Sequence, residues 1–214
     1  MDKKLIIIPT YNEIENIEAI THKVFSIEGN YHILVIDDGS PDGTASKVKV
    51  LQKEFPDRLF LIERSGKLGL GTAYLTGFKW SLDHGYDYTF EMDADFSHNP
   101  DDVPRLYQAC KDGADLAVGS RYCNGISVVD WPLGRIMMSY FASTYVRTVL
   151  RMKGYGFQIE MKYTAFRLGF KIVEVPIIFI NRQLGTSKMS GSIFGEAFWG
   201  VLKLRFRRIK PRKA

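Results

Sequence analysis

The sequence has few cysteines and no long hydrophobic run. Cys110 and Cys123 are the only cysteines among 214 residues, so no disulfide framework is indicated and a reducing cytosol fits. No apolar stretch is long enough to span a bilayer. The N-terminus, MDKKLIIIPTYNE, breaks its short apolar run at Pro9, which is not the pattern of a secretory signal. We therefore expect neither a secreted nor a membrane-spanning protein.

Positive charge is concentrated at the C-terminus. The formal net charge is +5, but residues 203–213 alone contribute seven positive charges, and subtracting them leaves −2 for the rest. The basicity is therefore a property of the tail, and we expect no nucleic-acid partner for the body of the chain. The composition, 45% hydrophobic and 25% charged, is that of an ordinary globular protein, and 214 residues suggest one domain or one domain with a small appendage.

Short apolar runs alternate with helical patterns along the first half of the chain. Leu5–Ile8, a β-branched run before Pro9, is typical of a buried parallel strand. Further strands are expected at residues 32–36, 59–62, up to Asp93, and 114–119, with helices at 14–25, 45–55, 72–84 and 104–111. Strand–helix alternation with short connections predicts an α/β fold: a mostly parallel, Rossmann-like sheet with helices on both faces.

The stretch YDYTFEMDADFSHNP, residues 86–100, is expected to be a buried strand that ends in two carboxylates. Side chains at i and i+2 of a strand point the same way, so Asp93 and Asp95 are expected to share one side. Two acids so close repel each other unless a cation lies between them, and a divalent metal that also holds phosphate oxygens is the usual solution. The alternative is a surface turn with solvated acids, because short motifs have many false matches.

Polar residues recur where the expected strands end. Tyr11 and Glu13 follow the first strand, Asp37 and Asp38 follow the second, and Arg121 follows the fifth. In open parallel sheets, ligands bind outside the carboxyl ends of the strands. Acids and an arginine at one such edge suit a nucleotide with its metal.

The loop GKLGLG, residues 66–71, contains three glycines but matches neither common phosphate-binding pattern. No Gly-Lys-Ser/Thr opens the following helix, and the loop does not follow the first strand. Two interpretations stay open. It is a loop near the phosphates, with Lys67 as a candidate contact, or it is a plain connector.

The ordered motifs together resemble a known family. They are IIPTYNE, VIDDGSPDGT, GLGTAYLTGF, DADFSHNPDDVPRL and AVGSRY, followed by GYGFQIEM, EVPIIFINR and GTSKMSG. This set is similar to the family 2 glycosyltransferases of the GT-A fold, and within them to dolichyl- and polyprenyl-phosphate mannosyltransferases. The resemblance covers nearly the whole chain. It implies inverting, metal-dependent transfer of a mannosyl group from GDP-mannose to a dolichyl or polyprenyl monophosphate.

The resemblance also assigns roles on the donor side. The pocket for the base and ribose would be formed by Pro9, Tyr11, Glu13, Ile36 and Asp38. Asp93, Ala94 and Asp95 match the DxD that holds Mg²⁺ or Mn²⁺ and the donor diphosphate. Ser97 stands where relatives supply a third metal ligand.

Four cationic residues match positions around the phosphates. Arg121, Arg182 and Lys188 would contact the donor phosphates, and Arg135, in WPLGR, would meet the acceptor phosphate. Asn181 departs from the pattern, because relatives carry an aspartate before the matching arginine. By this resemblance, Asp93, Asp95, Arg135 and Arg182 are the candidate catalytic residues.

The sequence contains no Glu-Asp dipeptide, a pair from which many GT-A enzymes take a general base. A sugar hydroxyl needs such a base, whereas a phosphomonoester, with a second pKa of about 6, is already largely a dianion at neutral pH. Arginine suits a phosphate acceptor because its planar fork matches phosphate oxygens. The missing base and the available arginines both favour a phosphate acceptor.

Two helices in the second half bear on the lipid. Residues 136–152 are expected to form an ordinary packing helix or, alternatively, a hydrophobic wall for the lipid acceptor. Residues 193–206 form an aromatic, amphipathic pattern that runs into the basic tail, which is typical of a membrane-interface helix; a solvated tail and a nucleic-acid patch are the alternatives. We expect a catalytic domain at 1–189 and an interfacial segment at 190–214. The protein would lie peripherally on the cytoplasmic face of a membrane, with a separate membrane-anchoring subunit as a further candidate partner.

One departure from the family concerns the acceptor side. Relatives carry a segment between Arg147 and GYGFQIEM, but here Met152 runs directly into Lys153. Either the protein lacks this segment, or the sequence omits a mobile loop and is numbered through the gap. We favour the second interpretation.

Three alternative functions remain from the residues themselves. A family 2 enzyme could use UDP-glucose or another UDP-sugar with a polyprenyl phosphate. A phosphatase of the haloacid dehalogenase type also places DxD at a strand end, but on its first strand rather than its fourth. A non-catalytic nucleotide-binding module is disfavoured by the intact DxD together with Arg182 and Lys188.

Overall fold

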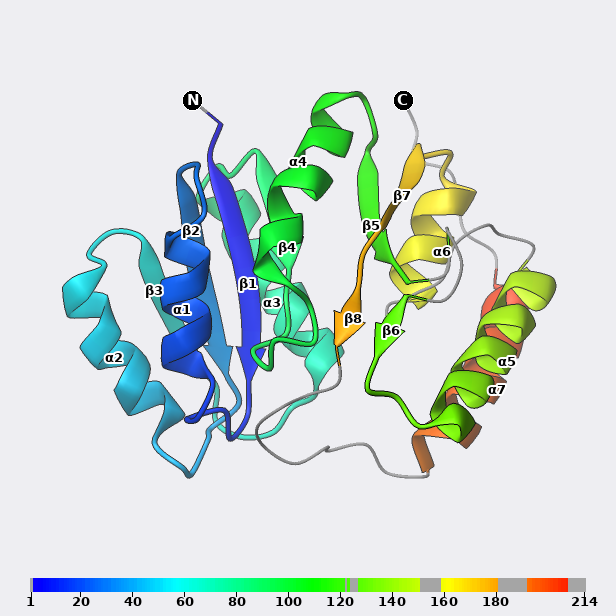
Figure 1. Cartoon of the computed structure of the whole chain (residues 1–214), viewed down its shortest axis with the longest axis horizontal. Helices are drawn as coiled ribbons and strands as arrows, with labels where there is room; N and C mark the ends of the chain where they lie inside the picture. The colour runs from blue at the N-terminus through cyan, green and yellow to red at the C-terminus, as the bar shows by residue number, and fades with distance from the viewer. Residues whose placement is uncertain (1, 122, 124–126, 151–158, 181–191, 208–214) are drawn as a thin grey trace. The chain divides into compact units, whose positions relative to one another are not determined.

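The computed structural model describes residues 2–121, 123, 127–150, 159–180 and 192–207 (Figure 1). These residues fall into two compact units that part between Val103 and Pro104. This division differs from the expected boundary at residue 189, which lies outside the described residues. Each unit is described by itself.

The first unit is built on a four-stranded parallel sheet. Its strands are β1 (Lys4–Thr10), β2 (Tyr31–Asp37), β3 (Leu59–Glu63) and β4 (Tyr88–Glu91), in the spatial order β3-β2-β1-β4. The chain therefore adds two strands on one side of β1 and then crosses to its other side. This is the parallel α/β arrangement that the sequence predicted.

Both faces of this sheet are buried under helices. Ile6 and Ile8 of β1, with Ile33 and Val35 of β2 beside them, pack against α1 (Ile17–Phe25) and α2 (Thr44–Glu54). The alternate residues of the same strands face α3 (Leu70–Asp83), which covers the opposite face in Figure 1. Burial on both faces explains why β1 is a continuous apolar run rather than an alternating one.

A glycine allows α3 to pack closely on β1. A Cβ at Gly77 would lie 2.7 Å from Cδ1 of Ile7, a side chain that is fully buried. Gly77 therefore sets the distance between the helix and the strand, and it fixes where α3 and its preceding loop lie.

The second unit contains two short parallel strand pairs and a helical cluster. β5 (Leu116–Ser120) pairs with β7 (Ile172–Pro176), and β6 (Val128–Val129) pairs with β8 (Phe179–Ile180). α4 (Val103–Lys111) precedes β5. Side chains of α5 (Leu133–Leu150), α6 (Ile159–Arg167) and α7 (Ser192–Phe206) form a separate small core: Val146, Leu150, Tyr163, Val201 and Leu204.

The expected membrane-interface helix forms, but part of its apolar face is used internally. Val201 and Leu204 of α7 are buried in the small core, whereas Trp199 and Phe206 are exposed. Among the α7 side chains whose burial the structure describes, the aromatic rings of Trp199 and Phe206 are available to another surface. Within the part of the chain that the structure describes, no helix is both long and apolar enough to cross a membrane.

Candidate active site

The strand order of the first unit contains a switch point. The order reverses between β1 and β4, because the chain leaves β1 in one direction for β2 and later returns on the other side as β4. Such a switch point, at the carboxyl ends of the strands, is where open α/β sheets bind ligands. The loops that begin there carry Tyr11 and Glu13 after β1, and Asp93 and Asp95 after β4.

The two acids lie in a turn rather than at a strand end. β4 stops at Glu91, two residues before the predicted end at Asp93, so strand alternation does not orient Asp93 and Asp95. The chain instead turns through Phe96, whose φ of 59° is left-handed and unusual for a large side chain. Asp95 is buried, and its Oδ1 accepts a hydrogen bond of 3.0 Å from the Ser97 amide. The turn is thus fixed by its own contacts.

Tyr74 of α3 lies beneath this turn and was not identified from the sequence. Its hydroxyl donates to Oδ1 of Asp93 over 3.5 Å. Burial raises the pKa of Tyr74 well above its usual range, and the nearby negative charges of Asp93 and Glu91 raise it further. The phenol therefore stays protonated and keeps its role as a donor. Nothing in the sequence indicated this contact, because it depends on how α3 packs against the sheet.

The residues of this turn suit a hard divalent cation. Asp93 and Asp95 offer carboxylate oxygens, and the Ser97 Oγ is buried without a hydrogen-bond partner. Oxygen ligands of this kind are those that Mg²⁺ and Mn²⁺ prefer. No group of three His, Cys, Asp or Glu side chains that could hold a metal occurs among the residues described. A cation at Asp93 and Asp95 would therefore complete its coordination with other oxygens, such as those of a phosphate.

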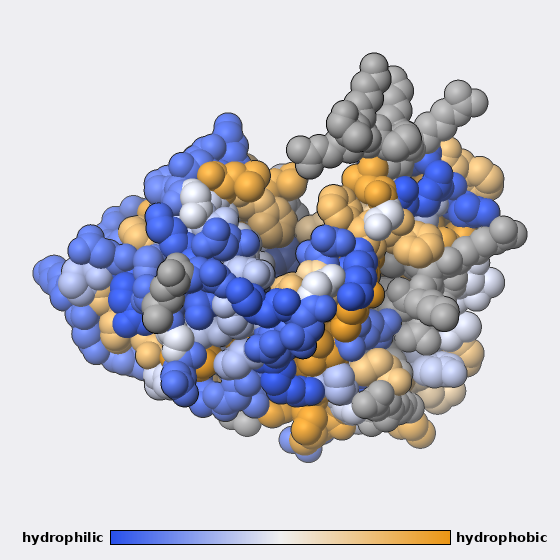
Figure 2. All heavy atoms as spheres, turned by 90° about the horizontal axis from the view of Figure 1, so that it is seen from above, coloured by the Kyte–Doolittle hydropathy of each residue, from blue (hydrophilic) through white to orange (hydrophobic). Residues whose placement is uncertain are grey.

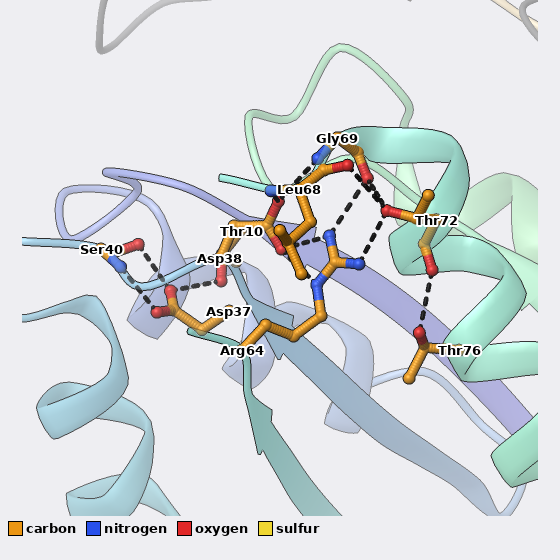
Figure 3. Close-up of polar contacts among 9 residues, drawn as sticks. All are labelled: Thr10, Asp37, Asp38, Ser40, Arg64, Leu68, Gly69, Thr72 and Thr76. Atoms are coloured by element: carbon orange, nitrogen blue, oxygen red, sulfur yellow. Dashed lines mark hydrogen bonds and ion pairs between the residues drawn. The ribbon is translucent and has the colours of Figure 1, made fainter. Parts of the chain in front are cut away.

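Asp38 has a different set of partners from those expected. Its carboxylate forms an ion pair with Arg64, directly after β3, and both side chains are only 8% exposed (Figure 3). Its Oδ2 also accepts from the amides of Leu68 at 3.1 Å and Gly69 at 3.2 Å. Arg64 in turn donates to the Gly69 carbonyl at 3.1 Å and to the Thr72 hydroxyl at 2.8 Å. The pair therefore holds the glycine-rich loop and the first turn of α3 against the sheet.

The other residues predicted for the base and ribose pocket differ in how available they are. Ile36 is fully buried in the core under α3, so its side chain does not reach a ligand. Glu13 is buried and accepts a hydrogen bond from Asn16. Tyr11 is half-buried, and the ammonium of Lys67 lies 4.9 Å from the centre of its ring. The structure thus brings the glycine-rich loop and the β1 loop together.

Asp37, the neighbour of Asp38, stabilises the loop after β2. Its carboxylate accepts from the Thr10 hydroxyl at 2.8 Å and from the Ser40 amide at 2.8 Å (Figure 3). The carboxyl ends of β1 and β2 are tied together by these contacts. Asp37 is therefore a structural residue of the site.

Two predicted arginines meet in the second unit. Arg121, after β5, lies 4.9 Å from the ring centre of Trp131, and Arg135, in the first turn of α5, lies 4.1 Å from the same ring. Pairing of β6 with β8 brings Phe179 to Trp131 as well. Arg182 and Lys188, the remaining predicted cations, lie outside the described residues.

The order of motifs and the fold agree with one family. The chain matches the model of glycosyl transferase family 2 over residues 5–174. The chain belongs to glycosyl transferase family 2. It is a glycosyltransferase, and the phosphatase and the non-catalytic module are thereby ruled out. The family resemblance inferred from the motifs is confirmed.

Three curated relatives are similar to this chain over most of its length. A polyprenol monophosphomannose synthase from Mycolicibacterium smegmatis is 44% identical, and the alignment covers 93% of this chain and 87% of that protein. An undecaprenyl-phosphate mannosyltransferase from Micrococcus luteus is 41% identical, with 97% and 98% covered. A dolichol-phosphate mannosyltransferase from Pyrococcus furiosus is 34% identical; there the alignment covers 94% of this chain but only 63% of the relative.

Solved structures share the fold. A mannosyltransferase from Pyrobaculum calidifontis, in complex with GDP-Man and Mn²⁺, has a TM-score of 0.57 at 19% identity, over 95% of this chain and 63% of its own. A mycobacterial protein has a TM-score of 0.62 at 18% identity, over 95% of this chain and 74% of its own. At these identities the likeness shows the fold alone, and it confirms the predicted α/β architecture.

The relatives carry residues that have no counterpart in this chain. The alignments with the Mycolicibacterium and Micrococcus proteins run over 231 and 240 positions, more than the 214 residues of this chain. The segment inferred to be missing between Met152 and Lys153 falls at a point outside the described residues. The interpretation that a mobile loop has dropped out of the sequence there stays a prediction.

Proposed function

We propose that this protein is an inverting, metal-dependent glycosyltransferase that moves a mannosyl group from GDP-mannose to a polyprenyl monophosphate. The observation that carries the proposal is the turn of Asp93, Asp95 and Ser97 at the switch point of the sheet, in a chain 44% identical to a polyprenol monophosphomannose synthase. The GDP-Man and Mn²⁺ bound by a structural neighbour support the same donor and the same class of metal.

On the donor side, the chain provides oxygen ligands and positive charge. Asp93 and Asp95 would hold Mg²⁺ or Mn²⁺ through their carboxylates, and the unpartnered hydroxyl of Ser97 is a weaker third ligand. When bound, the cation would neutralise the negative charge that develops on the departing diphosphate. Tyr74 keeps Asp93 oriented through its hydroxyl. Arg182 and Lys188 are proposed to contact the same phosphates.

On the acceptor side, the chain binds and orients rather than deprotonates. With a second pKa of about 6, a phosphomonoester is largely a dianion at neutral pH, so its oxygen is already a nucleophile. Arg135, the acceptor contact that the resemblance implies, would screen its charge. We assign Arg121 to the same phosphate rather than to the donor phosphates, because both arginines contact Trp131. Attack opposite the leaving diphosphate inverts that carbon, so an α-linked donor gives a β-linked product.

The lipid part of the acceptor requires contact with a membrane surface. Four exposed apolar side chains recur on one side of the first three turns of α5: Leu133, Met137, Tyr140 and Phe141. Trp199 and Phe206 are exposed on α7, which leads into the basic tail. On the face drawn in Figure 2, hydrophilic residues dominate the first unit, and hydrophobic residues are more frequent on the second. These features support peripheral attachment to an anionic surface on the cytoplasmic side.

A donor panel tests the proposal directly. Purified protein is incubated with a short polyprenyl phosphate, Mn²⁺ and either GDP-mannose, UDP-glucose or UDP-GlcNAc, and products are identified by mass spectrometry. We expect polyprenyl-phosphate mannose as the product with GDP-mannose, and no product with either UDP-sugar. Product from a UDP-sugar instead would establish the alternative donor, and transfer to the plain polyprenol would overturn the phosphate acceptor. Absence of any product with all three donors would reject the activity.

A pair of variants separates the metal site from general damage. Asp95→Asn removes one proposed ligand, whereas Asp83→Asn removes an exposed carboxylate at the end of α3. Asp95→Asn should abolish metal-dependent binding of GDP-mannose by calorimetry, and Asp83→Asn should leave it unchanged. Equal affinity in both variants would contradict the metal site.

A further inference from the structure

Trp131 connects the two arginines of the second unit. The guanidinium carbons of Arg121 and Arg135 lie 4.9 Å and 4.1 Å from the centre of its ring. The two carbons are therefore separated by at most the sum of these distances, about 9 Å. Guanidinium groups are attracted to an indole face, which is the strongest of the aromatic faces for cations. One tryptophan thus holds two cationic side chains that come from different elements.

The surroundings of Trp131 fix its ring. Phe179 of β8 packs edge-on against it, with ring centres 5.5 Å apart, and Phe179 also contacts Arg121, whose guanidinium carbon lies 4.7 Å from its centre. Asp130, directly before it, has a left-handed φ of 57°, and Pro132, directly after it, restricts the backbone. The orientation of the indole is therefore set by packing and backbone geometry.

The polar atom of Trp131 does not explain why a tryptophan stands here. Its Nε1 is buried and has no hydrogen-bond partner. Burying an unpaired donor is unfavourable, so the gain from the ring must exceed this loss. What the ring contacts is the pair of arginines and Phe179. Trp131 therefore makes these contacts through its ring and not through its N–H.

We propose that Trp131 is a positioning residue that assembles Arg121 and Arg135 into a single binding site for a phosphate monoester. Two like charges within about 9 Å of each other repel, and a dianion that both arginines bind offsets this repulsion. Arginine forks on two sides can engage different oxygens of one phosphate. The inference rests on the proposed function, in which that phosphate is the headgroup of the lipid acceptor, and it extends the site to a residue that contacts no substrate.

Binding, rather than turnover, tests the role of Trp131. The affinities of inorganic phosphate and of farnesyl phosphate are measured by calorimetry on the full chain, with GDP and Mn²⁺ present so that the donor site is filled. Trp131→Leu removes the aromatic face and should weaken both ligands about 10-fold, the size expected for two partly desolvated cation–π contacts. Trp131→Phe keeps an aromatic face and should restore most of the affinity. GDP-mannose affinity should not change in either variant.

Control measurements separate a positioning role from lipid contact and from general damage. Trp199→Leu removes an exposed tryptophan of the same unit and should have no effect on inorganic phosphate. If Trp131→Leu weakens farnesyl phosphate but not inorganic phosphate, Trp131 contacts the lipid chain and the inference is wrong. Equal loss of GDP-mannose affinity would indicate general disruption and also overturn it. If the wild type binds both phosphates but transfers no sugar, the proposed function fails while the phosphate site stands.

Discussion

At the scale of single residues, three charged side chains of the first unit stabilise the loops that form the site. Asp37 accepts hydrogen bonds from the end of β1 and from its own following loop, and the pair of Asp38 with Arg64 binds the glycine-rich loop. Asp38 is an example. The motif predicted that it contacts a ligand, but its carboxylate binds Arg64 and two loop amides. A ligand that needs Asp38 would have to compete with an ion pair that is nearly excluded from water.

The first prediction concerns this ion pair. Arg64→Met should destabilise the fold by about 3 kcal/mol, because it leaves the Asp38 carboxylate buried without a counter-charge. The double variant Arg64→Met with Asp38→Asn should recover part of the loss, since the charge is then gone. Unfolding in urea, followed by circular dichroism, measures both.

An exposed ion pair provides the matched control. Lys49 and Glu63 are 2.7 Å apart, but their side chains are 55% and 48% exposed. Lys49→Met should cost less than about 1 kcal/mol, as exposed pairs usually do. If Arg64→Met costs no more than Lys49→Met, the loop does not depend on the buried pair.

The sequence predicted the acids of the site but not the residues that hold them. Asp93 and Asp95 stand in a recognisable motif, and their place after the fourth strand followed from the strand pattern. Tyr74 donates to Asp93 from 19 residues away, and Arg64 pairs with Asp38 from 26 residues away, through packing that no local pattern encodes. Trp131 belongs to the WPLGR motif, but no sequence pattern singles it out, because its importance depends on two arginines that meet it in space.

At the scale of elements, boundaries were predictable where an apolar pattern was strong. Helices α2 and α3 and strands β1 to β3 lie within about two residues of their predicted positions. β4 ends earlier than predicted because its register with β1 stops at Glu91, and the Met92 amide, which donates to the Ile7 carbonyl at 3.1 Å, makes the last contact between the two strands. The two-residue strands β6 and β8 are too short to give a periodic signal, yet they bring Phe179 to Trp131.

The second prediction concerns the contact of α3 with β1. In Gly77→Ala, the new Cβ would lie 2.7 Å from Cδ1 and 2.8 Å from Cγ2 of the buried Ile7, so the helix or the strand must shift. We expect a loss of about 1–3 kcal/mol relative to a helical alanine without such a clash. Gly71→Ala in the same helix is that reference, because nothing lies within 4 Å of its Cβ position. Equal midpoints of urea unfolding for the two variants would contradict close packing at Gly77.

At the scale of the whole molecule, we propose a division of tasks between the two units. The first contains the loops at the switch point and the proposed metal ligands. The second contains the two arginines on Trp131 and the exposed apolar residues of α5 and α7. A nucleotide sugar is a polar substrate and a polyprenyl phosphate is largely apolar, so this division matches the chemistry of a donor unit and an acceptor unit.

The third prediction concerns the apolar surface of α5. Leu133 and Phe141 are 71% and 64% exposed and lie on one side of the helix. Apolar surface in contact with water is unfavourable, and contact with a membrane would remove it from water. Replacing both by serine should lower co-sedimentation with anionic liposomes several-fold. Higher salt should lower it further, because the basic tail contributes by electrostatic attraction that ions screen.

Two exposed apolar residues of the first unit decide whether this effect is specific. Val50 and Leu82 are 60% and 78% exposed on α2 and α3, so replacing both by serine removes a comparable apolar area from a unit that we expect to face the nucleotide rather than the lipid. If this control lowers liposome binding as much as the α5 variant, adsorption is non-specific and the division of tasks fails. If only the α5 variant loses binding, the membrane-facing surface belongs to the unit that holds Arg121 and Arg135, as the proposed division of tasks requires.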